Sequence, residues 1–161
     1  MTITLEAIEA QQSKLSEDHA RINAVIEEFK KRLVVTEITF PAVTIPFAAG
    51  ERYAGMILGE GSQPNYHLIL MPGEAESLNW ADAQEWAADR GGELPTRREQ
   101  SFLFANLKGE FSANWYWSAE AREDHSGWAW IQDFYDGSRS NDPQSNEFRA
   151  RAVRRFIPSV I

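Results

Sequence analysis

A heptad repeat near the start of the chain constrains its folding more than any other feature. Residues 4–33 contain neither proline nor glycine, and apolar side chains recur there with the spacing of a coiled-coil seam. One seam position holds Ile8, Leu15, Ile22 and Phe29, and the other holds Leu5, Gln12, His19, Ile26 and Leu33. This pattern predicts a helix whose narrow apolar stripe has to be buried against another surface.

Two surfaces could cover this stripe, namely a second copy of the helix or the chain's own domain. We favour self-association because the stripe is narrow and terminal, and we expect a homo-oligomer with a parallel trimer as the preferred form. The residues expected to form the interface are Ile8, Leu15, Ile22, Ile26 and Phe29. Polar Gln12 and His19 would fix the register, and a metal-binding role for His19 is disfavoured.

The rest of the sequence predicts two further regions. Residues 36–53 contain Pro41 and Pro46 among alternating apolar residues, which is typical of an extended linker. Residues 54–161 carry the patterns of a folded domain, beginning with a hairpin formed by residues 54–59 and 65–72. The N-terminal region, residues 1–35, is then a separate oligomerisation segment.

Two helices are predicted after this hairpin. Asn79 is a favourable cap for the first, and a Gly91-Gly92 pair ends it. In the second, Thr96 and Glu99 have the spacing of a capping box, which predicts a structural role for both residues. Apolar runs at residues 115–120, 127–137 and 147–156 then predict strands, separated by turns at 122–127 and 137–146. The order of elements predicts an α+β domain with two helices packed on short antiparallel strands.

Composition narrows the classes of function. The chain of 161 residues has no cysteine, which excludes disulfides and thiol chemistry. Its net charge of −8 disfavours nucleic acid as a partner, despite four arginines in residues 148–156. The N-terminus lacks the pattern of a signal peptide, and no apolar run is long enough to cross a membrane. We expect a cytoplasmic or virion-associated protein.

Several short motifs in residues 54–156 together carry a resemblance to a known family. The matching residues are Leu94, Pro95, Thr96, Glu99, Tyr116, Trp117, Ser118, Trp130, Phe134, Gly137, Val153 and Arg154. In this order they resemble the Lcl-type domain of unknown function, found in bacterial and phage proteins. That domain is similar to the formylglycine-generating-enzyme branch of the C-type-lectin-like fold, so the resemblance implies a C-type-lectin-like domain here.

The chemistry of those relatives does not transfer to this chain. Formylglycine-generating enzymes use a pair of active-site cysteines, and this chain has none. Lectins of the fold hold Ca²⁺ through motifs such as Gln-Pro-Asp, whereas Gln63-Pro64-Asn65 lies in the first hairpin. Asn141, Asp142 and Glu147 could supply oxygens, but no motif organises them. We therefore expect no metal and no cofactor.

A search for catalytic patterns also points away from an enzyme. No zinc-protease, nucleophile-elbow or phosphate-loop motif is present. Asp124-His125-Ser126 contains the residue types of a triad, but consecutive residues cannot converge as a triad requires. His67 is expected to be packed in the core, His125 to be solvated in a turn, and Arg97 and Arg98 to be solvated or paired with acids.

A polar segment at residues 133–148 is the favoured candidate for binding. It contains no aliphatic residue, and tyrosine mixed with short polar residues is typical of adaptable binding surfaces. The predicted ligand-binding residues of this late polar loop are Tyr135, Ser138, Arg139, Asn141, Asp142, Gln144 and Asn146. The favoured hypothesis is a non-catalytic recognition module for a protein or glycan. The alternative is an intracellular phage or bacterial protein that inhibits a host factor through its acidic surface.

Overall fold

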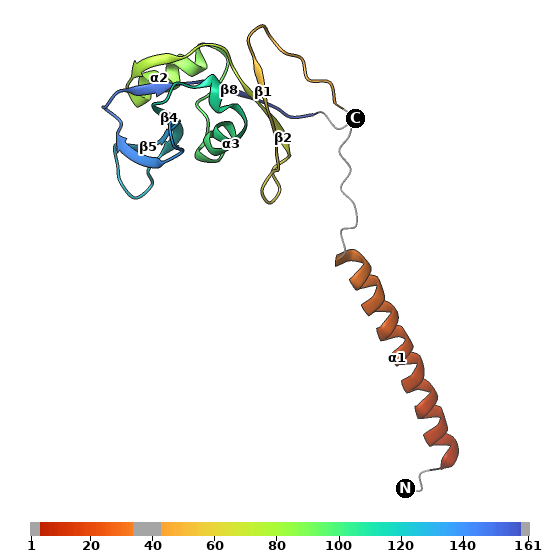
Figure 1. Cartoon of the computed structure of the whole chain (residues 1–161). Helices are drawn as coiled ribbons and strands as arrows, with labels where there is room; N and C mark the ends of the chain where they lie inside the picture. Colours follow the sequence, from red (N-terminus) through yellow and green to blue (C-terminus); the bar gives the residue numbers. More distant parts are fainter. Residues whose placement is uncertain (1–3, 34–42, 159–161) are drawn as a thin grey trace. The chain divides into compact units, whose positions relative to one another are not determined.

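The computed structural model describes residues 4–33 and 43–158 of the chain. The chain divides into two compact units, Met1–Ala42 and Val43–Ile161, which are described separately below. The first contains helix α1 (Leu5–Leu33), and the second, the head, contains the remaining helices and strands (Figure 1). Much of the predicted linker, at residues 34–42, lies outside the described residues.

Helix α1 confirms the predicted N-terminal helix. Its 29 residues run without a break, and Glu6 in the first turn complements the positive end of the helix dipole. Within this unit the apolar side chains of the seam are exposed, from 44% for Ile26 to 65% for Leu15 and 71% for Leu5. Within the described residues of this unit, nothing covers the stripe.

The head contains two sheets. A three-stranded antiparallel sheet has the order β1-β2-β8, formed by Arg52–Ile57, Tyr66–Leu70 and Val153–Phe156. A five-stranded sheet has the order β3-β7-β4-β5-β6, formed by Ala75–Leu78, Phe148–Ala150, Trp115–Ala121, Trp128–Asp133 and Arg139–Pro143. The β4–β7 pair is parallel and the other pairs are antiparallel. This mixture of helices and sheets confirms the predicted α+β class.

Two helices cover opposite faces of the five-stranded sheet. Helix α2 (Trp80–Ala88) packs on β3, β7 and β4, and its buried Ala83 and Ala87 contact Trp117 and Ile131 in one core. Helix α3 (Arg97–Leu107) lies between the five-stranded sheet and β1, as Figure 1 shows. Its Leu103 belongs to a second core, which α3 shares with both sheets. A short 3-10 helix, η1 (Lys108–Glu110), follows it.

Three features of the strand pattern differ from the sequence-based expectation. Residues 137–146, expected to form a turn, contain strand β6, because a polar strand at a sheet edge needs few apolar side chains. Residues 147–156, expected to form one strand, divide into β7 and β8 in different sheets. Strand β3 was not expected, since its sequence, AESL, lacks alternation.

Within the head, the ion pair between Arg154 and Glu51 fastens the segment that precedes β1 to strand β8. Arg154 on β8 donates to both carboxylate oxygens of Glu51, at 2.6 and 2.7 Å, and to the carbonyl oxygen of Pro46 at 2.7 Å. The Glu51 side chain is 4% exposed and also accepts the N–H of Ala48. These contacts, here called the Arg154 clamp, hold residues 46–51 against the three-stranded sheet.

Candidate functional site

The capping box at the start of α3 is confirmed, and it belongs to a larger buried network. The Thr96 side chain accepts the N–H of Glu99, and the Glu99 carboxylate accepts the N–H of Thr96 at 2.8 Å. The same carboxylate is fully buried and accepts two hydrogen bonds from Arg155 on β8, at 2.6 and 2.8 Å. Tyr66 on β2 donates a further bond at 2.9 Å. The capping box therefore joins α3 to the three-stranded sheet.

The charges of this network are perturbed by their surroundings. Burial and the neighbouring Glu99 charge raise the pKa of the Tyr66 phenol to about 12, which keeps it a hydrogen-bond donor. Burial also acts to raise the pKa of Glu99, but hydrogen bonds from Arg155, Thr96 and Tyr66 and the Arg155 charge hold the pKa below its usual value. The network is fully paired, and we assign it a structural role.

Next to the first turn of α3, the part of the five-stranded sheet around Trp130 is left uncovered. Gln100 of α3 bonds to the carbonyl oxygens of Tyr116 and Trp117, and Gln132 on β5 donates to the Gln100 carbonyl oxygen. Because alternate residues of a strand share a face, Trp130 lies on the same face as Gln132 but one pair further along. Arg97, the first residue of α3, reaches over it.

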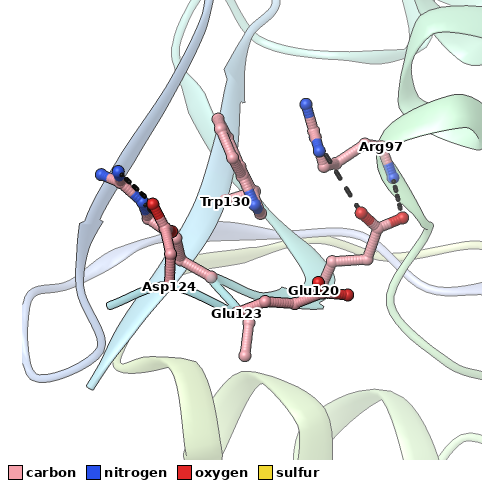
Figure 2. Close-up of a pocket in the computed structure, with 7 residues that line it drawn as sticks. Arg97, Glu120, Glu123, Asp124 and Trp130 are labelled. Carbon is pink, nitrogen blue, oxygen red and sulfur yellow. Dashed lines mark hydrogen bonds and ion pairs between the residues drawn. The ribbon is translucent and has the colours of Figure 1, made fainter. Parts of the chain in front are cut away.

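A hollow of about 520 Å³ opens at this place. It is lined by Arg97, Glu120, Ala121, Arg122, Glu123, Asp124 and Trp130, and is here called the Trp130 hollow. Figure 2 shows the Trp130 ring between Arg97 on one side and Asp124 on the other. The register of β4 and β5 shifts between Trp117 and Ala121, and this irregularity brings Glu120 beside the ring.

Ion pairs fix the charged side chains on both sides of the Trp130 hollow. The Arg97 guanidinium lies 3.8 Å from the centre of the Trp130 ring, and its Nε is 3.9 Å from a Glu120 carboxylate oxygen. Glu120 also accepts the backbone N–H of Arg97 at 3.1 Å. On the other side, Arg122 makes two hydrogen bonds to Asp124, at 2.7 and 2.9 Å. Two arginines and three acidic residues thus surround one aromatic ring.

The seven predicted ligand-binding residues do not form a single loop surface. Arg139 and Asn141 share a face of β6 with the partners Gln132 and Trp130, whereas Asp142 points to the other face. Tyr135 and Ser138 lie in the turn before β6, and Gln144 and Asn146 follow its other end. Of the seven, the structure brings Arg139 and Asn141 to the side of the Trp130 hollow.

Several of these side chains are occupied by internal bonds. Arg139 donates to Gln132 and to the carbonyl oxygen of Arg97, both at 3.3 Å. Asn141 accepts from Arg122 at 3.0 Å, and Gln144 donates to the carbonyl oxygen of Trp128 at 3.2 Å. Asn146 donates to Asp142. Tyr135, by contrast, has an exposed ring at 69% accessibility.

The two arginines that begin α3 are paired with acids, as the sequence predicted. Arg98 contacts Glu60 at 2.9 Å and donates to the carbonyl oxygen of Leu58, also at 2.9 Å. Arg97 pairs with Glu120 and, in addition, covers Trp130. The sequence showed Arg97, Arg122 and Trp130 as separate residues of a helix, a turn and a strand, so that no local signal marked them as one site.

The histidines occupy the predicted surroundings. His67 is buried in β2, where its Nδ1 lies 2.8 Å from the Tyr53 hydroxyl, and His125 is exposed in the turn after β4, with its ring 4.9 Å from that of Trp128. Among the described residues, no group of three or more histidine or acidic side chains is arranged to hold a metal ion. In the same part of the chain, no helix has the length and apolar character needed to cross a bilayer.

Neither the protein-family models nor the curated proteins contain a match. The geometry of the head and the exposed stripe of α1 are therefore the features that indicate a function.

Proposed function

We propose that this protein is a non-catalytic recognition module with a C-type-lectin-like head that binds a protein or glycan ligand, and that α1 associates several copies. The motifs that resemble the Lcl-type domain support this fold assignment by their positions. Leu94-Pro95-Thr96 leads into α3, Tyr116 and Trp117 lie in β4, and the Val153-Arg154 pair begins β8. Leu94, Tyr116, Trp117 and Val153 belong to the two cores of the head, whereas Trp130 of the same pattern lines the hollow.

The observation that carries the binding proposal is the Trp130 hollow. A half-buried aromatic ring surrounded by planar hydrogen-bonding groups, on a part of the sheet that no described helix covers, is a common basis of ligand recognition. The rigid strands β4 and β5 and the capped start of α3 supply its walls, so the site is formed before a ligand arrives. The neighbouring Asn141, which pairs with Trp130 across β5 and β6, extends the surface, and Tyr135 offers a separate exposed ring on the turn before β6.

In this proposal the N-terminal helix makes binding multivalent by joining several heads. An open hollow that solvent reaches binds a single ligand weakly, and joining several heads raises the overall affinity without any new contact. The exposed seam of α1 offers the surface for that association. The preferred form remains the parallel trimer predicted from the heptad pattern.

An array experiment tests the proposal. The intact chain is applied to glycan arrays and peptide arrays, and to host-cell lysate, beside the variants Trp130→Thr and Tyr135→Ala. We expect Trp130→Thr to abolish the specific signals and Tyr135→Ala to weaken them, with unchanged circular dichroism. The matched control is Trp86→Thr on α2, where a second arginine, Arg90, lies 4.1 Å from the ring centre.

The outcomes separate the favoured function from its alternative. Specific signals on a glycan or a surface protein that depend on Trp130 support the recognition module. Capture of one cytosolic factor that survives Trp130→Thr, and is lost when acidic residues elsewhere are neutralised, supports inhibition through the acidic surface instead. Equal signals from wild type, Trp130→Thr and Trp86→Thr refute the assignment of the hollow.

A further inference from the structure

We infer that the Trp130 hollow recognises a basic side chain, lysine or arginine, in an extended segment of a protein ligand, and that Arg97 occupies the ring in the absence of that ligand. The inference rests on the proposed function and specifies its ligand class. It makes Arg97 an internal competitor, so removing Arg97 is expected to improve binding. A site for a neutral glycan would give the opposite result or none.

Arg97 shows how the hollow accommodates a guanidinium. Its charged group lies 3.8 Å from the Trp130 ring centre and 3.9 Å from the Glu120 carboxylate, which are the two elements of cation recognition by an aromatic ring and an acid. The Arg97 side chain is 36% exposed, so solvent reaches part of it. A ligand arginine would take over contacts that already exist.

The charge of the lining favours a cationic occupant. Without Arg97, the hollow contains one arginine, Arg122, which two hydrogen bonds tie to Asp124. Glu120 and Glu123 then remain to receive an incoming cation. The chain as a whole carries a net charge of −8, which attracts basic ligands and repels acidic ones at a distance. An acidic polysaccharide or a nucleic acid is therefore the least suitable ligand.

A second hollow indicates that the ligand is longer than one residue. This hollow, of about 470 Å³, is lined partly by Tyr66 and Arg98, and it shares Glu120 with the Trp130 hollow. The two lie around the first turn of α3, so an extended segment with its basic side chain on Trp130 could continue past Glu120. A peptide fits this shape better than a single small cation.

Titration of the intact chain with tetra-arginine tests the inference. The tryptophan indole N–H signals are followed by NMR, and affinities are measured by calorimetry, with the uncharged isostere tetra-citrulline as the control peptide. We expect saturable tetra-arginine binding that shifts the Trp130 signal and weakens as salt is added. Arg97→Ala is expected to tighten binding about fivefold, because the ring no longer has a resident cation. Arg90→Ala, at the Trp86 ring, is expected to change nothing.

A second experiment neutralises the acidic residues that line the Trp130 hollow. Glu120→Gln with Glu123→Gln removes two charges while leaving Arg122 and Asp124 paired, and is expected to weaken tetra-arginine about tenfold. Glu76→Gln with Glu85→Gln removes the same charge from exposed positions on β3 and α2, and is expected to have little effect. Circular dichroism and the remaining indole signals verify that each variant is folded.

Three results would overturn the inference. These are equal binding of tetra-arginine and tetra-citrulline, unchanged or weaker binding by Arg97→Ala, and equal losses in the two neutralised pairs.

The array experiment can refute the proposed function independently of this inference. If array signals on a neutral glycan require Trp130 while tetra-arginine does not bind, the recognition module stands and the basic ligand is wrong. If tetra-arginine binds as expected but Trp130→Thr leaves all array signals intact, the hollow is not the recognition surface.

Discussion

Replacing Glu99 with glutamine is expected to destabilise the head by about 3 kcal/mol. The carboxylate is fully buried and accepts four hydrogen bonds, two from Arg155 and one each from Tyr66 and the backbone of Thr96. Glutamine keeps the shape but presents an amide NH₂ group to donors and leaves the Arg155 charge without its main partner.

The magnitude follows from the surroundings of Arg155. Removing one partner of a buried ion pair costs about 3–5 kcal/mol. The low end applies because the Arg155 side chain is 25% exposed and keeps its contact with Glu93. Glu93→Gln is the matched control, since it removes the other acid from the same arginine. The Glu93 side chain is 70% exposed, so the expected loss is below about 1 kcal/mol.

Urea denaturation followed by tryptophan fluorescence measures both variants. An unchanged slope with a shifted midpoint reports a change in the free energy of unfolding. The folded-state pKa of Glu99 is lowered, so its ionised form stabilises the head above the unfolded-state pKa, and this contribution is lost as the pH falls through the folded-state pKa. The gap between wild type and Glu99→Gln should therefore close below about pH 4. Equal losses for Glu99→Gln and Glu93→Gln at pH 7 would show that burial of the Glu99 carboxylate does not determine the loss of stability.

Three further predictions concern other parts of the chain. Tyr66→Phe removes one hydrogen bond to the buried Glu99 carboxylate and should cost about 1.5–3 kcal/mol by urea denaturation, whereas no loss would show that solvent replaces the hydroxyl. Gly59→Ala would place a Cβ 1.9 Å from the Gln63 carbonyl oxygen and should cost about 1–3 kcal/mol of unfolding free energy. Its control, Gly109→Ala, meets no atom within 4 Å and should be near neutral, so similar melting temperatures for the two variants would contradict this prediction. Ile22→Asp should reduce the mass measured by light scattering to that of one chain, unlike Ala24→Asp outside the seam, and a monomeric wild type would refute the oligomer.

The parts of the fold that sequence predicted correctly are those set by local chemistry. The α3 cap needs two residues three positions apart, the α2 cap needs Asn79 with a free N–H at Asp82, and α1 needs an uninterrupted heptad pattern. Each cap lies within a few residues and the heptad pattern within one continuous segment, so all three were recognisable without knowledge of the rest of the chain.

The missed features depend on residues that are distant in sequence. Strand β6 exists because its backbone pairs with β5, and its polar side chains gave no alternation to recognise. The Trp130 hollow combines the first residue of α3, an irregular stretch of β4 and the middle of β5. The sequence indicates only the capping role of Glu99, because its other partners, Tyr66 and Arg155, lie 33 and 56 positions away along the chain.

The Arg154 clamp has a mechanical consequence for a head carried on a helix. Tension that travels along the chain from α1 reaches the head at Pro46, where a hydrogen bond and a buried ion pair transfer it to β8. Strand β1, which lies at the edge of its sheet, is then shielded from being peeled away one hydrogen bond at a time. A ligand pulling on several heads at once would load this joint before it loaded the sheet.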